Sequence, residues 1–184
     1  AAVVSDDLAD AFGLGGDYLE ESVRWALGLR SERPDGIPAM AASLRLEDAL
    51  RGFLAEQGTK YVPKEQLWRL VGGALRLRLT AYSLAGLPHP SVDPDPARGR
   101  LGEHSQRIAR WYGDLAAELR RPTADRPIVT PEPHGPYPSD DVPAEHLSCT
   151  LWVGEHLRHL SEHLEDLTGP AAAVADRRAT PWWR

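Results

Sequence analysis

The segment from Leu44 to Leu84 constrains the fold of this chain more than any other. It reads LRLEDALRGFLAEQGTKYVPKEQLWRLVGGALRLRLTAYSL, which predicts an amphipathic helix, a sharp break and then a longer helix that is apolar nearly all round. A helix that is apolar on most sides needs neighbours on most sides. We therefore predict a bundle of helices with the second of these two helices at its centre.

The rest of the chain predicts an all-α fold, a roughly five-helix bundle with proline-rich connectors. No segment shows the alternation of β-branched and polar residues that is typical of strands. The pattern of apolar residues and capping signals defines the helices instead. The predicted helices cover about residues 5–30, 43–58, 63–85, 101–120 and 144–167.

Local signals set the predicted ends of these helices. GLGG at 13–16 is expected to break the first helix, and Asp17 with Glu20 then forms a capping box that restarts it. Ser43 is the expected cap of the second helix, and Gly169-Pro170 is expected to end the last one.

We predict a single helical domain over residues 1–184. Its expected parts are four helical segments in 1–121, a proline-rich surface connector over 122–143, the last helix over 144–168 and a tail over 169–184.

The bulk composition excludes several classes of protein. A hydrophobic content of 42% and a charged content of 26% are typical of a globular chain. A net charge of −6 argues against a general nucleic-acid binder, which would be basic. Cys149 is the single cysteine, so an intramolecular disulfide is excluded. The start, AAVVS, has no intact signal peptide, and we expect a soluble piece cut from a longer protein or a mature form left after cleavage.

The sharpest motif is HLSEH, from His159 to His163, which matches the H-x-x-E-H pattern of one class of zinc proteases. Two histidines four residues apart lie on one helix face and can share a zinc ion, and Glu162 can activate a water. Only 21 residues follow His163, whereas that class takes a third, acidic ligand from far downstream. The other interpretation is that the histidines flank a packing seam or face solvent, and we predict no cofactor.

Arg78 is the one charged residue on an otherwise apolar stripe of the helix predicted over 63–85. A charge on an apolar face needs a partner. The partner is either an internal carboxylate or water, or else an anionic ligand in a site to which Trp68 also contributes. Trp68 is one of four tryptophans that we expect at the core or its margin, and their positions are Trp25, Trp68, Trp111 and Trp152.

The segment RLEDALRGFLAEQGTK, followed by a proline-started helix that contains ALRLRL, resembles the soluble region of bacterial FUSC-type membrane proteins. This is the fusaric-acid-resistance and aromatic-acid-exporter-like family. The resemblance covers about 40 residues and is carried by Glu47-Asp48-Ala49, by FLAE at 53–56 and by Gly58. It implies transmembrane helices elsewhere in the parent protein and a helical domain here, on the cytoplasmic face of the inner membrane. It also implies efflux of small aromatic or other organic acids by the parent. No functional residue is carried over by the resemblance.

Three hypotheses about function remain open from the sequence. The first is a non-enzymatic cytoplasmic domain of a membrane transporter, which contacts the transmembrane part of its own chain or copies of itself in an assembly or regulatory role. The second is a free-standing helical protein that binds a small molecule or regulates another protein. The third is a zinc-dependent hydrolase that uses His159, Glu162 and His163.

Overall fold

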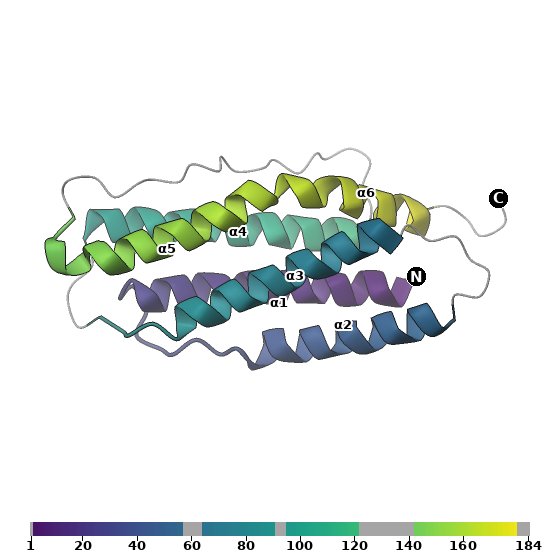
Figure 1. Cartoon of the computed structure of the whole chain (residues 1–184), viewed down its shortest axis with the longest axis horizontal. Coiled ribbons are helices and arrows are strands. Elements are labelled where there is room, and N and C mark those ends of the chain that lie inside the picture. The colour runs from purple at the N-terminus through teal and green to yellow at the C-terminus, as the bar shows by residue number, and fades with distance from the viewer. Residues whose placement is uncertain (1, 57–63, 91–94, 122–141, 180–184) are drawn as a thin grey trace.

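Figure 1 shows the computed structural model, which describes residues 2–56, 64–90, 95–121 and 142–179. These residues form six helices and no strand, which confirms the prediction of an all-α bundle. The helices are α1 (Ala2–Ala26), α2 (Ile37–Ala55), α3 (Lys64–Ala85), α4 (Pro96–Arg120), α5 (Ala144–His163) and α6 (Glu165–Ala179).

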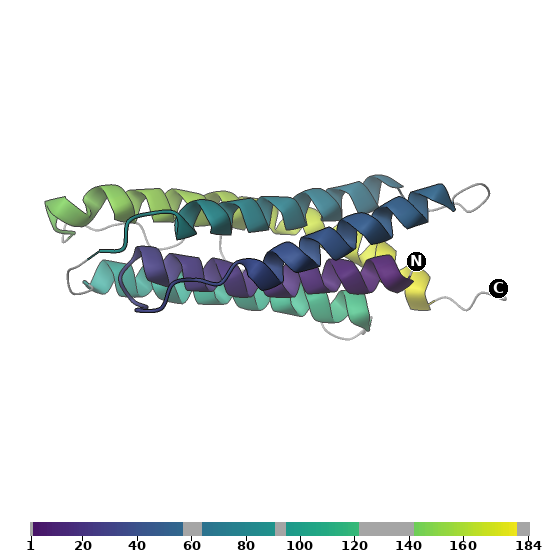
Figure 2. The same ribbon diagram turned by 90° about the horizontal axis from the view of Figure 1, so that it is seen from below.

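The centre of the bundle is α1, not α3. Helix α1 packs against α2, α3 and α4, while α5 and α6 follow one another across α3 and α4 (Figures 1 and 2). The chain leaves α4 at one end of the bundle and enters α5 at the other (Figure 1). Residues 122–141, which carry nearly all of the predicted proline-rich connector, lie outside the described residues.

The prediction that α3 lies at the centre is wrong because only one face of it is covered. Leu70, Leu77 and Leu84 are fully buried on that face. The opposite face leaves Leu75 and Leu79 about half exposed, at 47% and 48%. Helix α3 therefore has neighbours on one side and an apolar face left open on the other.

The predicted break at GLGG is also wrong, because α1 runs unbroken through residues 13–16. A Cβ atom on Gly15 would lie 2.9 Å from Leu77 Cδ2 of α3, and one on Gly16 would lie 3.3 Å from the Ala109 carbonyl oxygen of α4. Each glycine inside a helix lowers the stability of the helix by about 1 kcal/mol relative to alanine. Here the missing side chains let two neighbouring helices approach α1 closely, and the packing that follows holds the glycines helical.

Two further helices begin earlier than predicted. Helix α2 begins at Ile37 rather than at Ser43, after Gly36 and with Pro38 in its first turn, where a missing N–H costs nothing. Helix α4 begins at Pro96 rather than at 101, because Asp95 is its N-cap.

Gly169-Pro170 does not end the last helix. The helix is interrupted at Leu164 and continues as α6 through Pro170, so the first part of the predicted tail is helical. Proline lacks the N–H that an interior helix position needs. Leu167, Pro170 and Ala171 are all buried, and we attribute the survival of the helix to their packing against α3 and α4. The spacing of three and four residues predicts one apolar stripe in this region, and all of its members are buried: Val153, Leu157, Leu160, Leu164 and Leu167.

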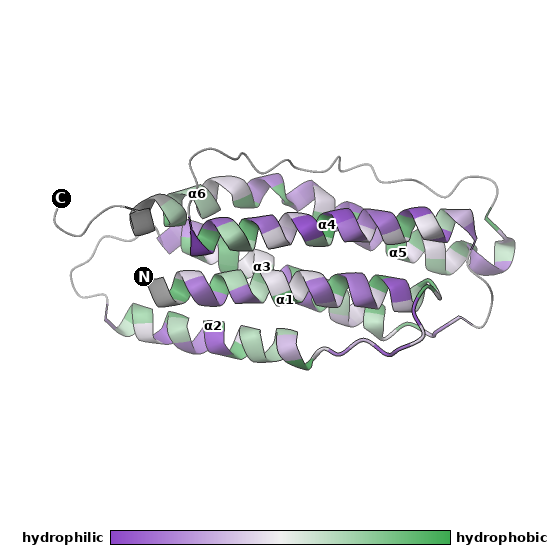
Figure 3. Ribbon diagram, turned by 180° about the vertical axis from the view of Figure 1, so that it is seen from behind, coloured by the Kyte–Doolittle hydropathy of each residue, from purple (hydrophilic) through white to green (hydrophobic). Residues whose placement is uncertain are grey.

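The four helical tryptophans are not equivalent. Trp111 lies in the core with 2% of its surface exposed, and Trp25 is half-buried, whereas Trp68 and Trp152 are 51% and 52% exposed. Figure 3 shows hydrophobic and hydrophilic residues alternating around α1 and α4, as in amphipathic helices. None of the helices in the described part of the chain has the length and apolar character that crossing a membrane requires.

Candidate functional site

Several buried or half-buried polar side chains gather at the carboxyl end of α1. Gly28, with φ of 74°, follows the helix and reverses the chain. The Gly28 N–H donates to the Trp25 carbonyl at 3.1 Å and the Leu29 N–H donates to the Arg24 carbonyl at 2.8 Å, which is a Schellman motif. The positive φ explains why glycine stands here. It also explains why α1 ends before the predicted Arg30.

Side chains from three other segments bond to the last carbonyl groups of α1. A helix end leaves such carbonyls without intrahelical donors, and they carry a partial negative charge. The three contacts are His89 Nδ1 to Trp25 O at 2.9 Å, Cys149 Sγ to Ala26 O at 3.3 Å and Arg98 Nη1 to Leu27 O at 3.3 Å. The end of α1 is therefore where α4, α5 and the segment after α3 meet.

A buried cluster of Asp95, Arg98 and His146 lies beside these contacts. Asp95 Oδ1 accepts a hydrogen bond from the Arg98 backbone N–H at 2.9 Å, and Asp95 Oδ2 accepts one from His146 Nδ1 at 3.1 Å. Arg98 Nε lies 3.6 Å from Asp95 Oδ2, and the Arg98 side chain is 1% exposed. Burial raises the pKa of Asp95, but these hydrogen bonds and the Arg98 charge outweigh it and hold the pKa below its ordinary value.

The bond to Asp95 decides the state of the His146 ring. A carboxylate only accepts hydrogen bonds, so Nδ1 carries the proton, and in the neutral ring Nε2 is an acceptor. Nε2 is buried and has no hydrogen-bond partner among the described residues. A buried polar atom without a partner is rare in folded proteins and calls for an explanation.

A cavity of about 550 Å³ lies against this cluster. Its polar lining includes Arg98 and His146, and Cys149 lies one helical turn beyond His146 on α5. Burial raises the pKa of the Cys149 thiol, and the nearby Arg98 charge only partly opposes this, so the thiol is protonated at neutral pH. The remaining lining residues are Leu87, Pro88, Pro90, Glu145, Ser148 and Trp152.

A second pocket, of about 610 Å³, adjoins the first and shares Leu87 and Pro88 with it. Its wall contains Trp25, whose ring stacks on the His89 ring with centroids 3.8 Å apart. The Arg33 guanidinium lies over the same Trp25 ring, 6.0 Å from its centroid. This arrangement holds the segment after α3 and the segment after α1 against the end of α1.

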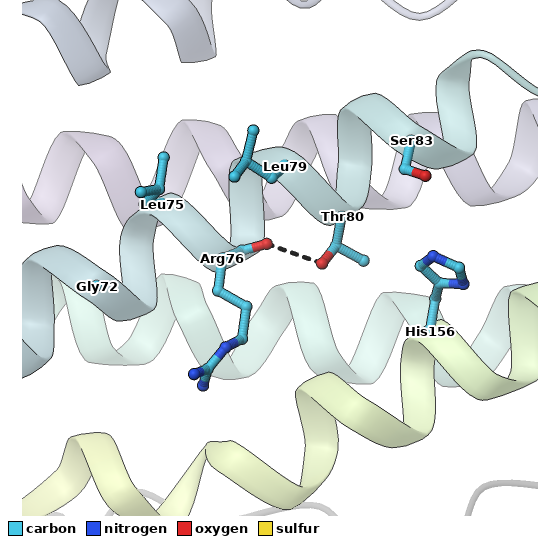
Figure 4. Close-up of a pocket in the computed structure, with 7 residues that line it drawn as sticks. All are labelled: Gly72, Leu75, Arg76, Leu79, Thr80, Ser83 and His156. Atoms are coloured by element: carbon cyan, nitrogen blue, oxygen red, sulfur yellow. Dashed lines mark hydrogen bonds between the residues drawn. The ribbon is translucent and has the colours of Figure 1, made fainter.

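A third, shallower feature is a groove of about 430 Å³ between α3 and α5, shown in Figure 4. Leu75 and Leu79 of α3 form its apolar part, and Arg76 and Thr80 lie beside them. His156 is the contribution of α5. The groove runs along the exposed apolar face of α3, so the two features are continuous.

Arg78 and Trp68, the predicted ligand-binding residues, line none of these three pockets. Arg78 is half-buried, and its Nε atom is buried without a hydrogen-bond partner among the described residues. Its charge acts on Tyr18, whose pKa is raised by burial and lowered in part by Arg78. Trp68 lies ten residues earlier on α3 and is 51% exposed. The structure does not bring the two residues together, and an anion site at Arg78 stays a prediction.

Within HLSEH, His159 and Glu162 are exposed and His163 is partly exposed, while the two residues between His159 and Glu162 are buried. The rings of His159 and His163 are stacked with centroids 6.5 Å apart, and His163 Nδ1 lies 3.3 Å from Asp166 Oδ2. Glu162 accepts a hydrogen bond from Arg158 Nη1 at 2.5 Å. Across the residues that the structure describes, no three histidine, cysteine or acidic residues are grouped so that they could hold a metal ion. Zinc binding by the histidine pair stays a prediction.

Sequence reasoning missed Asp95, Arg98 and His146. Asp95-Pro96 is a helix-start signal, since aspartate is a good N-cap and proline suits the first turn. The other prolines around it favour a loop instead, which is why the helix is predicted to begin only at 101. No local pattern links Arg98 to His146, which lie 48 residues apart and meet only through the fold.

Comparison with known proteins adds no assignment to this geometry, since the chain matches no protein-family model, no curated protein and no solved structure.

Proposed function

We propose that this chain is a non-enzymatic helical domain that works by docking, as the cytoplasmic part of an integral membrane transporter. The sequence support is the resemblance of Leu44–Leu84 to FUSC-type proteins. The structural support is the exposed apolar face of α3, and this is the observation on which the proposal chiefly depends.

The docking face of α3 consists of Trp68, Leu75, Leu79 and Tyr82. Their spacing of seven, four and three residues places them on one side of the helix. They are 51%, 47%, 48% and 67% exposed, while the opposite side of α3 is fully packed. A row of large apolar side chains on a surface is typical of an interaction site, whereas single exposed apolar residues are ordinary.

The groove beside this face fits an apolar helix. Figure 4 shows Leu75 and Leu79 on α3 beside Arg76 and Thr80, with His156 reaching toward α3 from α5. An amphipathic helix binds such a groove by placing its apolar side chains on the leucines. Arg76 shows no ion pair within the described part of the chain, so an acidic residue flanking the apolar face of the partner would meet it. The partner that we propose is a helix from the transmembrane part of the same chain.

Reading the complete gene on both sides of the region that encodes these 184 residues tests whether the chain is part of a membrane protein. We expect apolar segments of about 20 residues, the length that spans a bilayer. Their absence from the complete reading frame would reject the assignment to a membrane transporter.

Side-chain footprinting of the complete protein tests the docking face. We expect hydroxyl radicals to oxidise Trp68 and Tyr82 more slowly in the complete protein in detergent than in the isolated domain. Met40 on α2, which is 44% exposed, is the internal control. Equal oxidation of Trp68 and Tyr82 in both proteins would contradict docking at this face. If oxidation of Trp68 and Tyr82 in the isolated domain slows as the concentration of the domain rises, the face instead binds a second copy of the domain.

A further inference from the structure

We propose that the cavity at the carboxyl end of α1 binds a small neutral hydroxyl compound with a flat apolar body, such as a phenol, whose hydroxyl group donates to His146 Nε2. This binding site is separate from the docking face of α3 and does not depend on it.

The first step of the argument is the unmet hydrogen bond of His146. The ring donates through Nδ1 to Asp95, and in the neutral form of the ring Nε2 offers a lone pair. Nε2 is buried without a partner among the described residues, and His146 is one of the residues that line the cavity. A hydrogen-bond donor in the cavity, against the ring, would satisfy this atom.

The second step is that the site does not favour an anion. Arg98 is the one arginine or lysine among the described residues that line the cavity. Its charge is already opposed by Asp95, 3.6 Å from Nε, and by the carbonyl end of α1 through the bond to Leu27 O. Glu145 adds a negative charge to the lining. A carboxylate or phosphate would meet one compensated cation and one repelling carboxylate.

The third step is that the site does not favour a cation at His146. An ammonium group that reached Nε2 would lie beside the buried Arg98 guanidinium. The nearest buried carboxylate, Asp95, is already bonded to Arg98 and His146. Glu145, the other carboxylate of the lining, is exposed to solvent and therefore compensates a buried ammonium group only weakly. Taking a charge out of water without a close counter-ion is costly. A neutral hydroxyl donates the same hydrogen bond without this cost.

The fourth step concerns the body of the ligand. Leu87, Pro88, Pro90 and Trp152 supply apolar lining, and Trp152 offers an aromatic ring. Flat rings pack well against indole and proline surfaces. A cavity of about 550 Å³ is within the range of small-molecule sites.

Binding of four probes of similar size separates the chemical classes. The probes are phenol, toluene, benzoate and benzylamine, each titrated by calorimetry at pH 7.5. We expect phenol to bind with a Kd on the order of 1 mM. Toluene lacks the hydroxyl group and cannot donate to His146 Nε2. We expect it to bind about tenfold more weakly than phenol, because one buried hydrogen bond is lost. Tightest binding of benzoate or benzylamine, or no binding of phenol, would overturn the proposal.

Two variants of the same residue locate the hydrogen bond. His146→Asn keeps an N–H near the Nδ1 position for Asp95 but removes the acceptor at Nε2, so phenol should bind about tenfold more weakly. His146→Gln places an amide oxygen near the Nε2 position and should restore part of the affinity. His159→Asn, at an exposed position of α5 that does not line the cavity, is the matched control and should leave the affinity unchanged. Unchanged phenol affinity in His146→Asn would reject the assigned contact.

Cys149 reports where the ligand lies, because it is the single cysteine and lines the cavity. Alkylation by iodoacetamide should slow in the wild-type protein as phenol saturates the site, with the same midpoint as the calorimetric titration. Phenol binding that leaves the alkylation rate unchanged would place the ligand elsewhere and overturn the proposal.

Discussion

His146 Nδ1 lies 3.1 Å from Asp95 Oδ2, so a residue in the first turn of α5 is bonded to the N-cap of α4. The same carboxylate is the counter-ion of Arg98, whose side chain is 1% exposed. One aspartate thus joins two helices that are far apart in the sequence and neutralises a buried cation between them.

Replacing Asp95 tests this role. We expect Asp95→Ala to lower the free energy of unfolding by about 3 kcal/mol, because it leaves the buried Arg98 charge without its counter-ion. Asp95→Asn also removes the charge but keeps the cap, since asparagine accepts from the Arg98 N–H, and should therefore cost about 1 kcal/mol less than Asp95→Ala. Urea denaturation at pH 7 measures both changes. Equal stability of the alanine variant and the wild type would refute the counter-ion role.

Acid should destabilise the protein before its carboxylates titrate. His104 is 2% exposed, and burial, with a smaller effect of the Arg107 charge, lowers its pKa from 6.5 to about 4. The unfolded chain therefore takes up a proton at His104 below about pH 6.5, while the folded chain does so only near pH 4. Stability falls as the pH drops between these values, by up to about 3 kcal/mol.

Urea denaturation of the wild type and of His104→Gln between pH 7 and pH 4.5 measures this fall. We expect a flatter profile in the variant, while His156→Gln, altered on the exposed side of α5, should keep the wild-type profile. Parallel profiles of all three proteins would show that His104 is not the group responsible.

Gly72 and Gly73 provide a matched pair on α3. A Cβ on Gly73 would lie 2.7 Å from Leu167 Cδ2 of α6, whereas a Cβ on Gly72 would meet nothing within 4 Å. Gly72→Ala should therefore stabilise the protein by up to about 1 kcal/mol through helix propensity. Gly73→Ala should destabilise it by roughly 1–3 kcal/mol because Leu167 must move. Thermal unfolding ranks the two variants, and the same sign for both would contradict the close approach of α6 to α3.

The His159–His163 pair should bind zinc only weakly. Two imidazoles provide two of the four ligands of a typical structural zinc site, and Glu162 is held by Arg158. We expect zinc to be lost on dialysis, and weak binding to be abolished in His159→Ala. One zinc ion per chain that persists through dialysis and disappears in His159→Ala would instead support the metal site that HLSEH predicts.

Much of the architecture follows from periodicity alone. Residues three, four or seven apart share a helix face, and this spacing predicts the buried stripe of α4, which consists of Leu101, Ile108, Tyr112, Leu115 and Leu119. The ends of the helices were harder to predict, since GLGG and Gly169-Pro170 are strong local break signals. In both places the packing of neighbouring helices outweighs the local preference. Those neighbours are distant in the sequence, so a short segment gives no information about them.

The candidate site was less predictable than the fold. Arg78 and the histidine pair stand out in the sequence because they break a pattern or match a motif. Asp95, Arg98 and His146 do neither, and each looks like an ordinary charged or polar residue near a helix start. What distinguishes them is burial, which depends on which helices come together.

Local chemistry within the chain was enough to specify an all-helical protein and most of its inward-facing side chains, since these depend on the spacing of apolar residues along each helix. Only the tertiary structure made α1 the central helix, left one face of α3 open and placed a carboxylate, a guanidinium and an imidazole together at one end of the bundle. The physical reason is that these features come from contacts between residues distant in sequence. Their energies depend on packing distance and exclusion of water, which no local segment of the chain encodes.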